Sequence, residues 1–507
     1  MDDKIIVSNR SALTAKYGNA GVQKIRQAVT ALISADAKRG IKSRLVFLDD
    51  AVAMKSFKSK AVTDATDPRQ NKEAIDAIFK AGDPDYLMIL GAIDVVPHQD
   101  MTNPAFAPPD EPDKFAFGDL PYACDTPYSR DIATFKGPTR VVGRLPDLTK
   151  MTGSPAHLLS LLGFAEKFKS RDVADYGKYF GLSTHSWRKS TELSLSNAFG
   201  NPAALTIAPP AGPTHPPTRL APLAHFINCH GGPADPNFYG EKGSSQPVSL
   251  TSDCIAKKIK PGTVAAVECC YGAELYDSIT LGLPLPICQR YLAQGAYAYF
   301  GSSTIAYGPA EGNGAADLIT QYFLLAVLEG ASVGRAALMA RQQFVAQTGE
   351  LDPVDLKTLA QFSLLGDPSV VPAVVPSATS VPKGIDAERG DRQSRQQRRA
   401  KLRATGQMLQ ESKPTASKKA TRVRKSETVR RALRNIAREA GIGTKREFMA
   451  FDVKTPKGAR PRGSKAVPAT SRYYVAVFRQ KEEYPSVAAV AKEVSGRIVG
   501  YRIYTEK

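Results

Sequence analysis

Two short apolar segments, each ending in a reactive side chain followed by glycine, largely determine the architecture open to this 507-residue chain. They are LAHFINCHGG, residues 223–232, and GTVAAVECCYG, residues 262–272. Runs this rich in Val, Ile, Phe and Ala are typical of buried parallel strands, whose carboxyl ends meet at one edge of a sheet. The first segment delivers His230 to that edge and the second delivers Cys270. The sequence therefore predicts an α/β fold in which an imidazole and a thiol lie close together.

Further apolar runs alternate with helix-length segments, which predicts mostly parallel sheets flanked by helices in two subdomains. These runs include KIIVSN, SRLVFLDD, DYLMILG, DLPYACD, TRVVGRLPD and KYFGLSTHSW. The later stretch VPAVVPSATSVPKG has the composition of an extended linker. We expect an N-terminal α/β subdomain at residues 1–150, a catalytic subdomain at 151–372, a linker with a basic and partly helical segment at 373–465, and a small strand–helix–strand module at 466–507.

The formal net charge of +19 is concentrated in one segment, because residues 388–465 carry 24 Lys and Arg against 7 Asp and Glu. Such a segment attracts phosphate backbones or acidic proteins, so we expect an acidic partner or nucleic acid to bind there. A solvated linker is the alternative. The segment lacks a zinc-finger or helix-turn-helix pattern, which disfavours sequence-specific DNA recognition. Within it, Ser426 is placed to cap an amphipathic helix that Gly441 would end. Earlier in the chain, Ser332 is placed to cap a helix over SVGRAALMARQQFV.

Cysteine usage and hydropathy indicate the compartment. The six cysteines lack the paired spacing of a metal site and fit reduced thiols better than disulfides. No stretch stays apolar for ~20 residues, and the acidic start MDDKIIVSNR differs from a secretory signal. We therefore expect a cytoplasmic protein with no membrane segment, no metal and no cofactor.

Cys270, rather than its neighbour Cys269, is the predicted nucleophile. Side chains alternate along a strand, so the two cysteines face opposite ways. Cys270, at the strand end with Gly272 two positions on, is the one expected to be exposed. A cysteine becomes an effective nucleophile when an imidazole takes its proton, which makes His230 the predicted partner. Each residue alone is more often a buried structural one. Their placement after two successive apolar strands favours catalysis.

Several motifs in order along the chain resemble those of the gingipain family of caspase-like cysteine peptidases. They are YLMILGAIDVVP, DLPYA, VVGRLPD, NCHGG, ECCYG, YFGSSTIAYGP and LLGDPSV, and the resemblance covers residues 1–372. It implies a caspase-type α/β fold, a Cys-His dyad, and an oxyanion hole formed by the backbone amides of Gly231 and Cys270. It also implies cleavage of peptide bonds, often after a basic residue.

The sequence thus predicts an intracellular, regulated cysteine endopeptidase that acts on a protein or peptide substrate. Cleavage after Arg or Lys would let the enzyme process its own basic segment. Two alternatives stay open. One is a catalytically idle caspase-like scaffold whose basic tail binds nucleic acid or an acidic partner, and the other is a different thiol acyl-transfer enzyme, such as an amidase or a transpeptidase.

Residues that would hold the substrate are less well marked in the sequence. Ser302 and Tyr307 lie in the strand-to-loop segment that follows the nucleophile, and we expect them to shape a substrate groove. An acid is also required to orient His230 or to bind a basic side chain. The candidates near in sequence are Asp235, Glu268, Glu274, Asp277 and Glu311, and the sequence does not choose among them.

Overall fold

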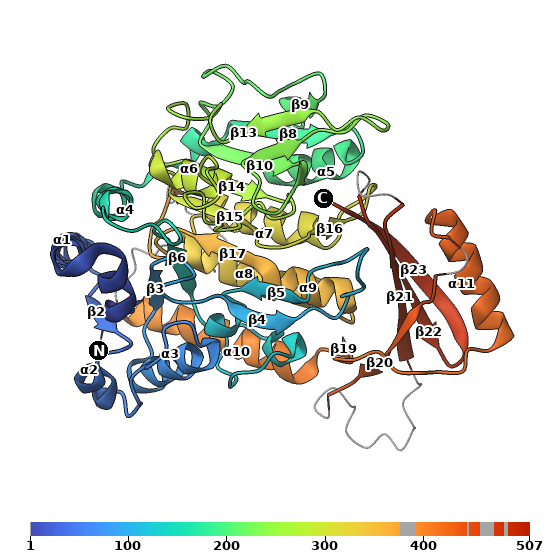
Figure 1. Ribbon diagram of the computed structural model, residues 1–507, viewed down its shortest axis with the longest axis horizontal. Coiled ribbons are helices and arrows are strands. Elements are labelled where there is room, and N and C mark those ends of the chain that lie inside the picture. The colour runs from blue at the N-terminus through green and yellow to red at the C-terminus, as the bar shows by residue number, and fades with distance from the viewer. Residues whose placement is uncertain (1, 376–391, 444–445, 457–470, 481–484) are drawn as a thin grey trace.

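A ten-stranded sheet forms the centre of the molecule in the computed structural model, which describes residues 2–375, 392–443, 446–456, 471–480 and 485–507 (Figure 1). Its strands are, in spatial order, β2 (Ser43–Phe47), β1 (Lys4–Ser8), β3 (Tyr86–Leu90), β6 (Val142–Leu145), β17 (Phe362–Leu365), β15 (Ala298–Ser302), β14 (Val264–Val267), β10 (Ala224–Asn228), β8 (Tyr179–Thr184) and β9 (Leu205–Ala208). Each half of five strands is parallel, and the halves meet where β17 pairs antiparallel with β15. Strands from both predicted subdomains therefore share one sheet.

Helices cover both faces of this sheet and bury them in two cores. One core includes residues of α1 (Arg10–Lys38), α4 (Ala156–Lys167) and α6 (Ile287–Ala293), and the other includes α7 (Ala316–Leu328), α8 (Val333–Gln347) and α9 (Pro353–Gln361). Along β14, Ala265 and Val267 belong to the first core, whereas Val264 and Ala266 belong to the second. A strand buried on both faces must be apolar throughout, which explains its sequence. The predicted fold class, a mostly parallel α/β sheet flanked by helices, is confirmed.

The smaller elements lie in the connections between these strands and helices and at the edges of the central layer. They are α2 (Ala51–Ser56), α3 (Pro68–Gly82), α5 (Arg188–Phe199), β4 (Gln99–Thr102), β5 (Phe115–Gly118), β7 (Arg171–Asp172), β11 (His230–Gly231), β12 (Asn237–Tyr239), β13 (Val248–Thr251), β18 (Ala373–Val374), and the 3-10 turns η1 (Leu120–Ala123), η2 (Ile132–Phe135) and η3 (Val173–Tyr176). Of these, β11, β12 and β13 form a separate three-stranded sheet that carries His230.

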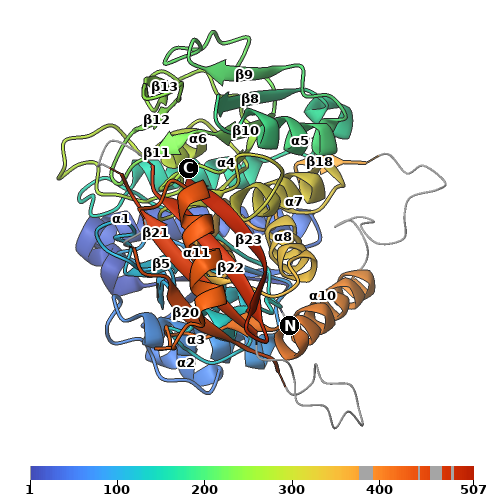
Figure 2. The same cartoon turned by 90° about the vertical axis from the view of Figure 1, so that its right-hand side faces the viewer.

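A second sheet, formed mainly by the C-terminal residues, stands beside the body (Figure 1). Its order is β16 (Tyr307–Gly308), β23 (Arg497–Glu506), β22 (Val487–Val494), β21 (Ser471–Phe478), β20 (Met449–Lys454) and β19 (Thr415–Ala416). Helix α11 (Glu427–Glu439) packs against this sheet, as Figure 2 shows. The first strand of this sheet, β16, belongs to the body, so the C-terminal strands pair directly with an edge of the body.

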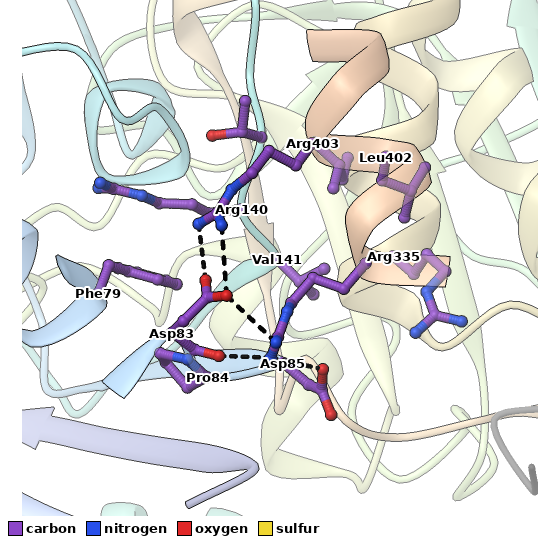
Figure 3. Close-up of a pocket in the computed structure, with 12 residues that line it drawn as sticks. Phe79, Asp83, Pro84, Asp85, Arg140, Val141, Arg335, Leu402 and Arg403 are labelled. Atoms are coloured by element: carbon purple, nitrogen blue, oxygen red, sulfur yellow. Dashed lines mark hydrogen bonds and ion pairs between the residues drawn. The ribbon is translucent and has the colours of Figure 1, made fainter. Parts of the chain in front are cut away.

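Part of the basic segment forms a helix, α10 (Arg392–Ser412), that docks on the body. Arg403 Nη2 lies 2.6 Å from Asp83 Oδ1, and Arg399 Nη1 lies 3.0 Å from Asp85 Oδ1. Figure 3 shows the Asp83 carboxylate facing Arg403 of α10. Some of the positive charge is therefore paired within the chain. An acidic or nucleic-acid partner of this segment stays a prediction.

Two predicted elements are wrong. The strand expected in DLPYACD is the 3-10 turn η1, where Pro121 lacks the N–H that a central strand needs. The helix expected in the strand–helix–strand module at 466–507, over the segment PSVAAVAKEVSG, is strand β22. The small apolar residues of this segment fit the periodicity of a helix as well as that of a strand. Pairing with β21 on one side and β23 on the other stabilises the strand.

Other local predictions are confirmed. Helix α11 begins after Ser426, whose side chain accepts a hydrogen bond from the Val429 amide, and Gly441 follows its end with a positive φ of 68°. Ser332 caps α8 by accepting a hydrogen bond from the Arg335 amide. Across the described part of the chain, no helix combines the length and the apolar character that crossing a bilayer requires.

Candidate active site

The carboxyl ends of β10 and β14 lie side by side and bring the two predicted catalytic segments together. Ile227 pairs with Val267, and the amide of Glu268 donates a hydrogen bond of 2.9 Å to the Ile227 carbonyl. Just beyond, the Cys229 amide donates to the Cys269 sulfur at 3.4 Å. The chain then continues on both sides into the residues that carry His230 and Cys270.

Gly231 permits the close approach of these two segments. A Cβ atom at Gly231 would lie 2.0 Å from the carbonyl oxygen of Cys270, a distance that no side chain tolerates. Glycine is therefore required here for backbone contact. The two residues whose amides are the predicted oxyanion hole are neighbours in space.

The two adjacent cysteines point into different cores, as expected, but both are fully buried, so the expectation that Cys270 is exposed is wrong. Cys269 belongs to the core with α1 and α4, whereas Cys270 belongs to the core with α7 and α8. The Cys270 sulfur accepts a hydrogen bond of 3.1 Å from the Ala306 amide. Burial and then the negative charge of Glu506 raise the pKa of Cys270 well above its usual value. In this arrangement the thiol is protonated.

His230 is held by a carboxylate that the sequence did not single out. Its Nε2 atom lies 3.0 Å from Oε2 of Glu241, and its ring packs edge-on against Trp187, with ring centroids 4.5 Å apart. Burial alone would raise the pKa of Glu241, but the hydrogen bond and charge of His230 outweigh it and lower that pKa. Glu241 reaches the imidazole because β11 and β12 pair antiparallel, with His230 opposite Tyr239.

Between the Cys270 thiol and the His230 ring, both within the described residues, the structure shows no direct hydrogen bond. The thiol is bonded to Ala306 and the imidazole to Glu241. The backbone carbonyl of another residue lies next to the predicted nucleophile instead.

That carbonyl belongs to Lys507. The Cys270 amide donates a hydrogen bond of 3.0 Å to the Lys507 carbonyl oxygen, and the Lys507 amide donates one of 2.9 Å to the Ala306 carbonyl. The preceding residue, Glu506, pairs with Tyr307 in the ladder between β23 and β16. The main-chain oxygen of Lys507 thus contacts one of the two amides predicted to stabilise an oxyanion.

The side chain of Lys507 fills a buried acidic pocket. Its Nζ atom lies 3.0 Å from Asn228 Oδ1, 2.7 Å from Glu268 Oε2 and 2.6 Å from Asp317 Oδ1. The ammonium also lies 4.9 Å from the centre of the Trp187 ring, within the range of a cation–π contact. Burial would lower the pKa of Lys507, but the charges of Asp317 and Glu268 outweigh burial and raise it. The ammonium is therefore charged and each of its three N–H groups has an acceptor.

Gly308 leaves the room that the lysine occupies. A Cβ atom at Gly308 would lie 2.1 Å from Cε of Lys507 and 2.7 Å from its Nζ. Any larger residue would obstruct this pocket. Gly308 itself pairs with Thr505 in the same ladder, so one residue serves both the strand pairing and the pocket.

The two residues predicted to line a groove lie in different surroundings. The backbone of Tyr307 faces Glu506, and its hydroxyl donates to Glu111 Oε2 at 2.7 Å. Ser302 is buried in β15, where its hydroxyl donates to the Thr304 carbonyl at 2.8 Å.

Of the five acids left open by the sequence, Glu268 lies in the lysine pocket. The other four bind elsewhere: Asp235 to Tyr239, Glu274 to the Ala234 amide, Asp277 to Thr280, and Glu311 to Lys189. The positions of Asn228 and Glu268 carried a signal that the sequence analysis did not use, although Glu268 was among its candidate acids. Asn228 stands two residues before His230, and Glu268 stands two residues before Cys270. Because side chains alternate along a strand, residues two positions apart point to the same face of the sheet. Asp317, Glu241 and Trp187 come from separate elements and carried no such signal.

The described residues contain no group of three or more His, Cys, Asp or Glu side chains arranged to hold a metal ion. The acids of the lysine pocket are satisfied by an ammonium group instead.

Comparison with known proteins supports the fold. No family model matches the sequence, and no curated protein matches it. Among solved structures, one described as "Structure of Protease" aligns with a TM-score of 0.50 at 13% sequence identity, over 99% of this chain and 96% of that chain. The molecule therefore shares the mixed α/β fold of a protein described as a protease. The narrower resemblance to gingipains stays a prediction.

Proposed function

We propose that this chain is a cysteine endopeptidase that cleaves peptide bonds on the carboxyl side of lysine. The observation that carries the proposal is the placement of Lys507, whose carbonyl oxygen meets the Cys270 amide while its ammonium fills the acidic pocket. A substrate lysine seated in the same way would present its scissile carbonyl to the thiol of Cys270. The shared fold with a protein described as a protease agrees with this assignment.

In the proposed reaction the His230 imidazole takes the thiol proton, and the Cys270 sulfur attacks the carbonyl carbon of the substrate lysine. The amides of Cys270 and Gly231 stabilise the resulting oxyanion, a contribution of about 3 kcal/mol per donor in other acyl-transfer enzymes. His230 then gives its proton to the leaving amine as the C–N bond breaks. Water hydrolyses the thioester and restores the thiol.

Glu241 is a positioning residue in this scheme. Because it is bonded to Nε2 of His230, the other ring nitrogen, Nδ1, is the one left to exchange protons with the thiol and the leaving amine. The carboxylate also stabilises the imidazolium that forms when the thiol is deprotonated.

The pocket matches lysine better than arginine. An ammonium group has three N–H donors, and Asn228, Glu268 and Asp317 supply one acceptor each. A guanidinium has five donors in a rigid planar fork and is bulkier at its end. We therefore propose that the residue before the cut is preferentially lysine rather than arginine, the two basic residues that the sequence analysis allowed.

Fluorogenic peptides that differ only in Lys, Arg, Asp or Leu before the cut test the proposal. Because Lys507 occupies the pocket, the assay is run with the wild-type chain and with Lys507→Ala. We expect hydrolysis after lysine that Cys270→Ala and His230→Ala abolish and that the matched control Cys269→Ala retains. The proposal is wrong if neither chain cleaves any peptide, or if Cys270→Ala cleaves as well as its parent.

Self-cleavage within residues 388–465 remains a separate proposal, supported by the many lysines of that segment. Incubating the purified chain beside Cys270→Ala and sequencing the fragments tests it. Fragments that begin directly after lysine, and only in the chain that keeps Cys270, would support it, whereas equally intact chains would reject it.

A further inference from the structure

We propose that residues 502–507 are a tethered, substrate-like inhibitor of the site, and that the edge of β16 that β23 now covers is the surface on which a substrate would lie as an added strand. This inference rests on the proposed function and identifies what regulates the site.

The first support is the backbone pairing between β16 and β23. Tyr307 pairs with Glu506 and Gly308 with Thr505, and the Lys507 amide continues the ladder by donating to the Ala306 carbonyl. Addition of an extended peptide to a strand edge is a common mode of peptide recognition, because main-chain hydrogen bonds supply affinity while pockets for side chains supply specificity. Here the segment supplies both the strand and a pocket-filling lysine.

The second support is that the segment is held from behind by its own sheet. The other edge of β23 pairs with β22 from Val487 opposite Thr505 to Val494 opposite Arg497. Arg479 Nη2 lies 2.6 Å from Glu506 Oε2. The occupant is therefore presented by a folded sheet of the same chain, which makes a second copy of the protein unnecessary.

The third support is the state of the nucleophile beneath the segment. Cys270 and Lys507 are both fully buried, so the site is closed to a larger reagent. The Glu506 carboxylate adds to burial in keeping the Cys270 thiol protonated. The segment thus opposes catalysis in two ways, since it fills the lysine pocket and disfavours the thiolate that attack requires.

The negative charge of the pocket makes the replacement of Lys507 by a substrate residue selective for lysine. If Lys507 withdrew alone, Glu268 and Asp317 would be left without the cation that both contact. Leaving buried carboxylates unpaired is costly. Another lysine restores the balance, so the occupant competes most directly with peptides that carry lysine at the same position.

Alkylation of Cys270 by iodoacetamide, mapped by mass spectrometry, measures occupancy without relying on turnover. We expect Lys507→Ala to react about tenfold faster than wild type or more, because a tethered ligand acts at an effective concentration in the mM range. Adding the heptapeptide YRIYTEK, residues 501–507, to Lys507→Ala should slow alkylation again. The control peptide YRIYTEA should have little effect.

A second variant keeps the test decisive if Lys507→Ala folds poorly. Gly308→Ala places a methyl group where the lysine side chain lies, so we expect faster alkylation of Cys270 that YRIYTEK does not reverse. Equal alkylation rates in wild type, Lys507→Ala and Gly308→Ala would overturn the inference.

Peptide hydrolysis separates the two proposals. If residues 502–507 inhibit a peptidase, Lys507→Ala cleaves lysine peptides faster than wild type, and YRIYTEK inhibits it competitively. Fast hydrolysis by wild type that Lys507→Ala does not exceed would reject the inhibitor and keep the peptidase. Faster alkylation with no hydrolysis in any chain would keep the occupant and reject the peptidase.

Discussion

Asn228 and Glu268 occupy equivalent places on neighbouring strands, each two residues before a predicted catalytic residue, and both contact the ammonium of Lys507. The two strand ends therefore carry two functions in alternation. One residue of each strand binds a lysine side chain, and the second residue beyond it is the proposed acid–base or nucleophilic group. In the proposed function, substrate choice and chemistry thus depend on the same short segments.

Removing either pocket carboxylate should weaken selection for lysine. In the Lys507→Ala background, we expect Glu268→Gln and Asp317→Asn each to lower kcat/KM for lysine peptides by roughly 10- to 100-fold, because a hydrogen bond to a charged group contributes about 1.5–3 kcal/mol. Steady-state kinetics with lysine and leucine peptides measures the change. The control Glu274→Gln, whose carboxylate binds the Ala234 amide, should keep the preference. Unchanged lysine preference in both pocket variants would contradict the assignment.

Glu241→Gln should slow the reaction while leaving substrate binding largely intact. The amide can still occupy the place of the carboxylate, but it carries no charge to stabilise an imidazolium. We expect kcat to fall about 100-fold or more, in line with the usual size of acid–base contributions, with KM changed little. Partial recovery in Glu241→Asp would distinguish a charge effect from a packing defect. A wild-type kcat in Glu241→Gln would exclude the positioning role.

Gly231→Ala should damage the site, whereas Gly232→Ala should be tolerated. The new methyl group at position 231 would meet the Cys270 carbonyl at 2.0 Å, but at position 232 the nearest atom, on Asp235, lies 3.5 Å away. We expect Gly231→Ala to lower the free energy of unfolding by about 1–3 kcal/mol, as overpacking generally does, and to abolish hydrolysis. Urea unfolding and peptide kinetics on both variants provide the check. Equal behaviour of the pair would argue against the close approach.

Glu274 should make stability depend on pH between its unfolded and folded pKa values. Burial raises the pKa of Glu274 from 4.5 to about 7. The folded state then holds its proton more tightly than the unfolded state, so its contribution to stability is fully present below pH 4.5 and is lost as the pH rises to about 7. We expect Glu274→Gln to gain up to about 3 kcal/mol relative to wild type across this interval, because each pKa unit corresponds to 1.36 kcal/mol. Urea unfolding of both chains at several pH values gives the difference, and parallel curves would contradict the prediction.

The layer architecture was predictable because its signals are local. Apolar runs such as those of β1, β3 and β14 fit strands, and Ser332 and Ser426 mark helix starts that the structure confirms. The helix expected at β22 was wrong because Ala-rich segments carry no clear period, and the neighbouring strands decide their structure. Local sequence cannot report that pairing.

The candidate site was predictable only where its residues lie on the two strand ends. His230 and Cys270 stay predictions whose backbones the fold brings together. Asp317 enters the lysine pocket from the start of α7, and Lys507 enters from the far end of the chain. Hydrophobic periodicity reports only on residues within one helix or strand, so it cannot relate residues this far apart in the sequence. The pocket that holds the lysine side chain is therefore apparent only in the three-dimensional arrangement of the strands.

For the proposed peptidase, the short ladder between β16 and β23 would add a second requirement on the substrate besides the lysine pocket. Lysine is abundant on protein surfaces, yet a chain that lies against β16 must be straight over the residues before the cut. Lysines within helices or rigid turns would escape, while those in segments free to straighten would be cut. The proposed peptidase would then select for local flexibility of the substrate segment as much as for the lysine side chain.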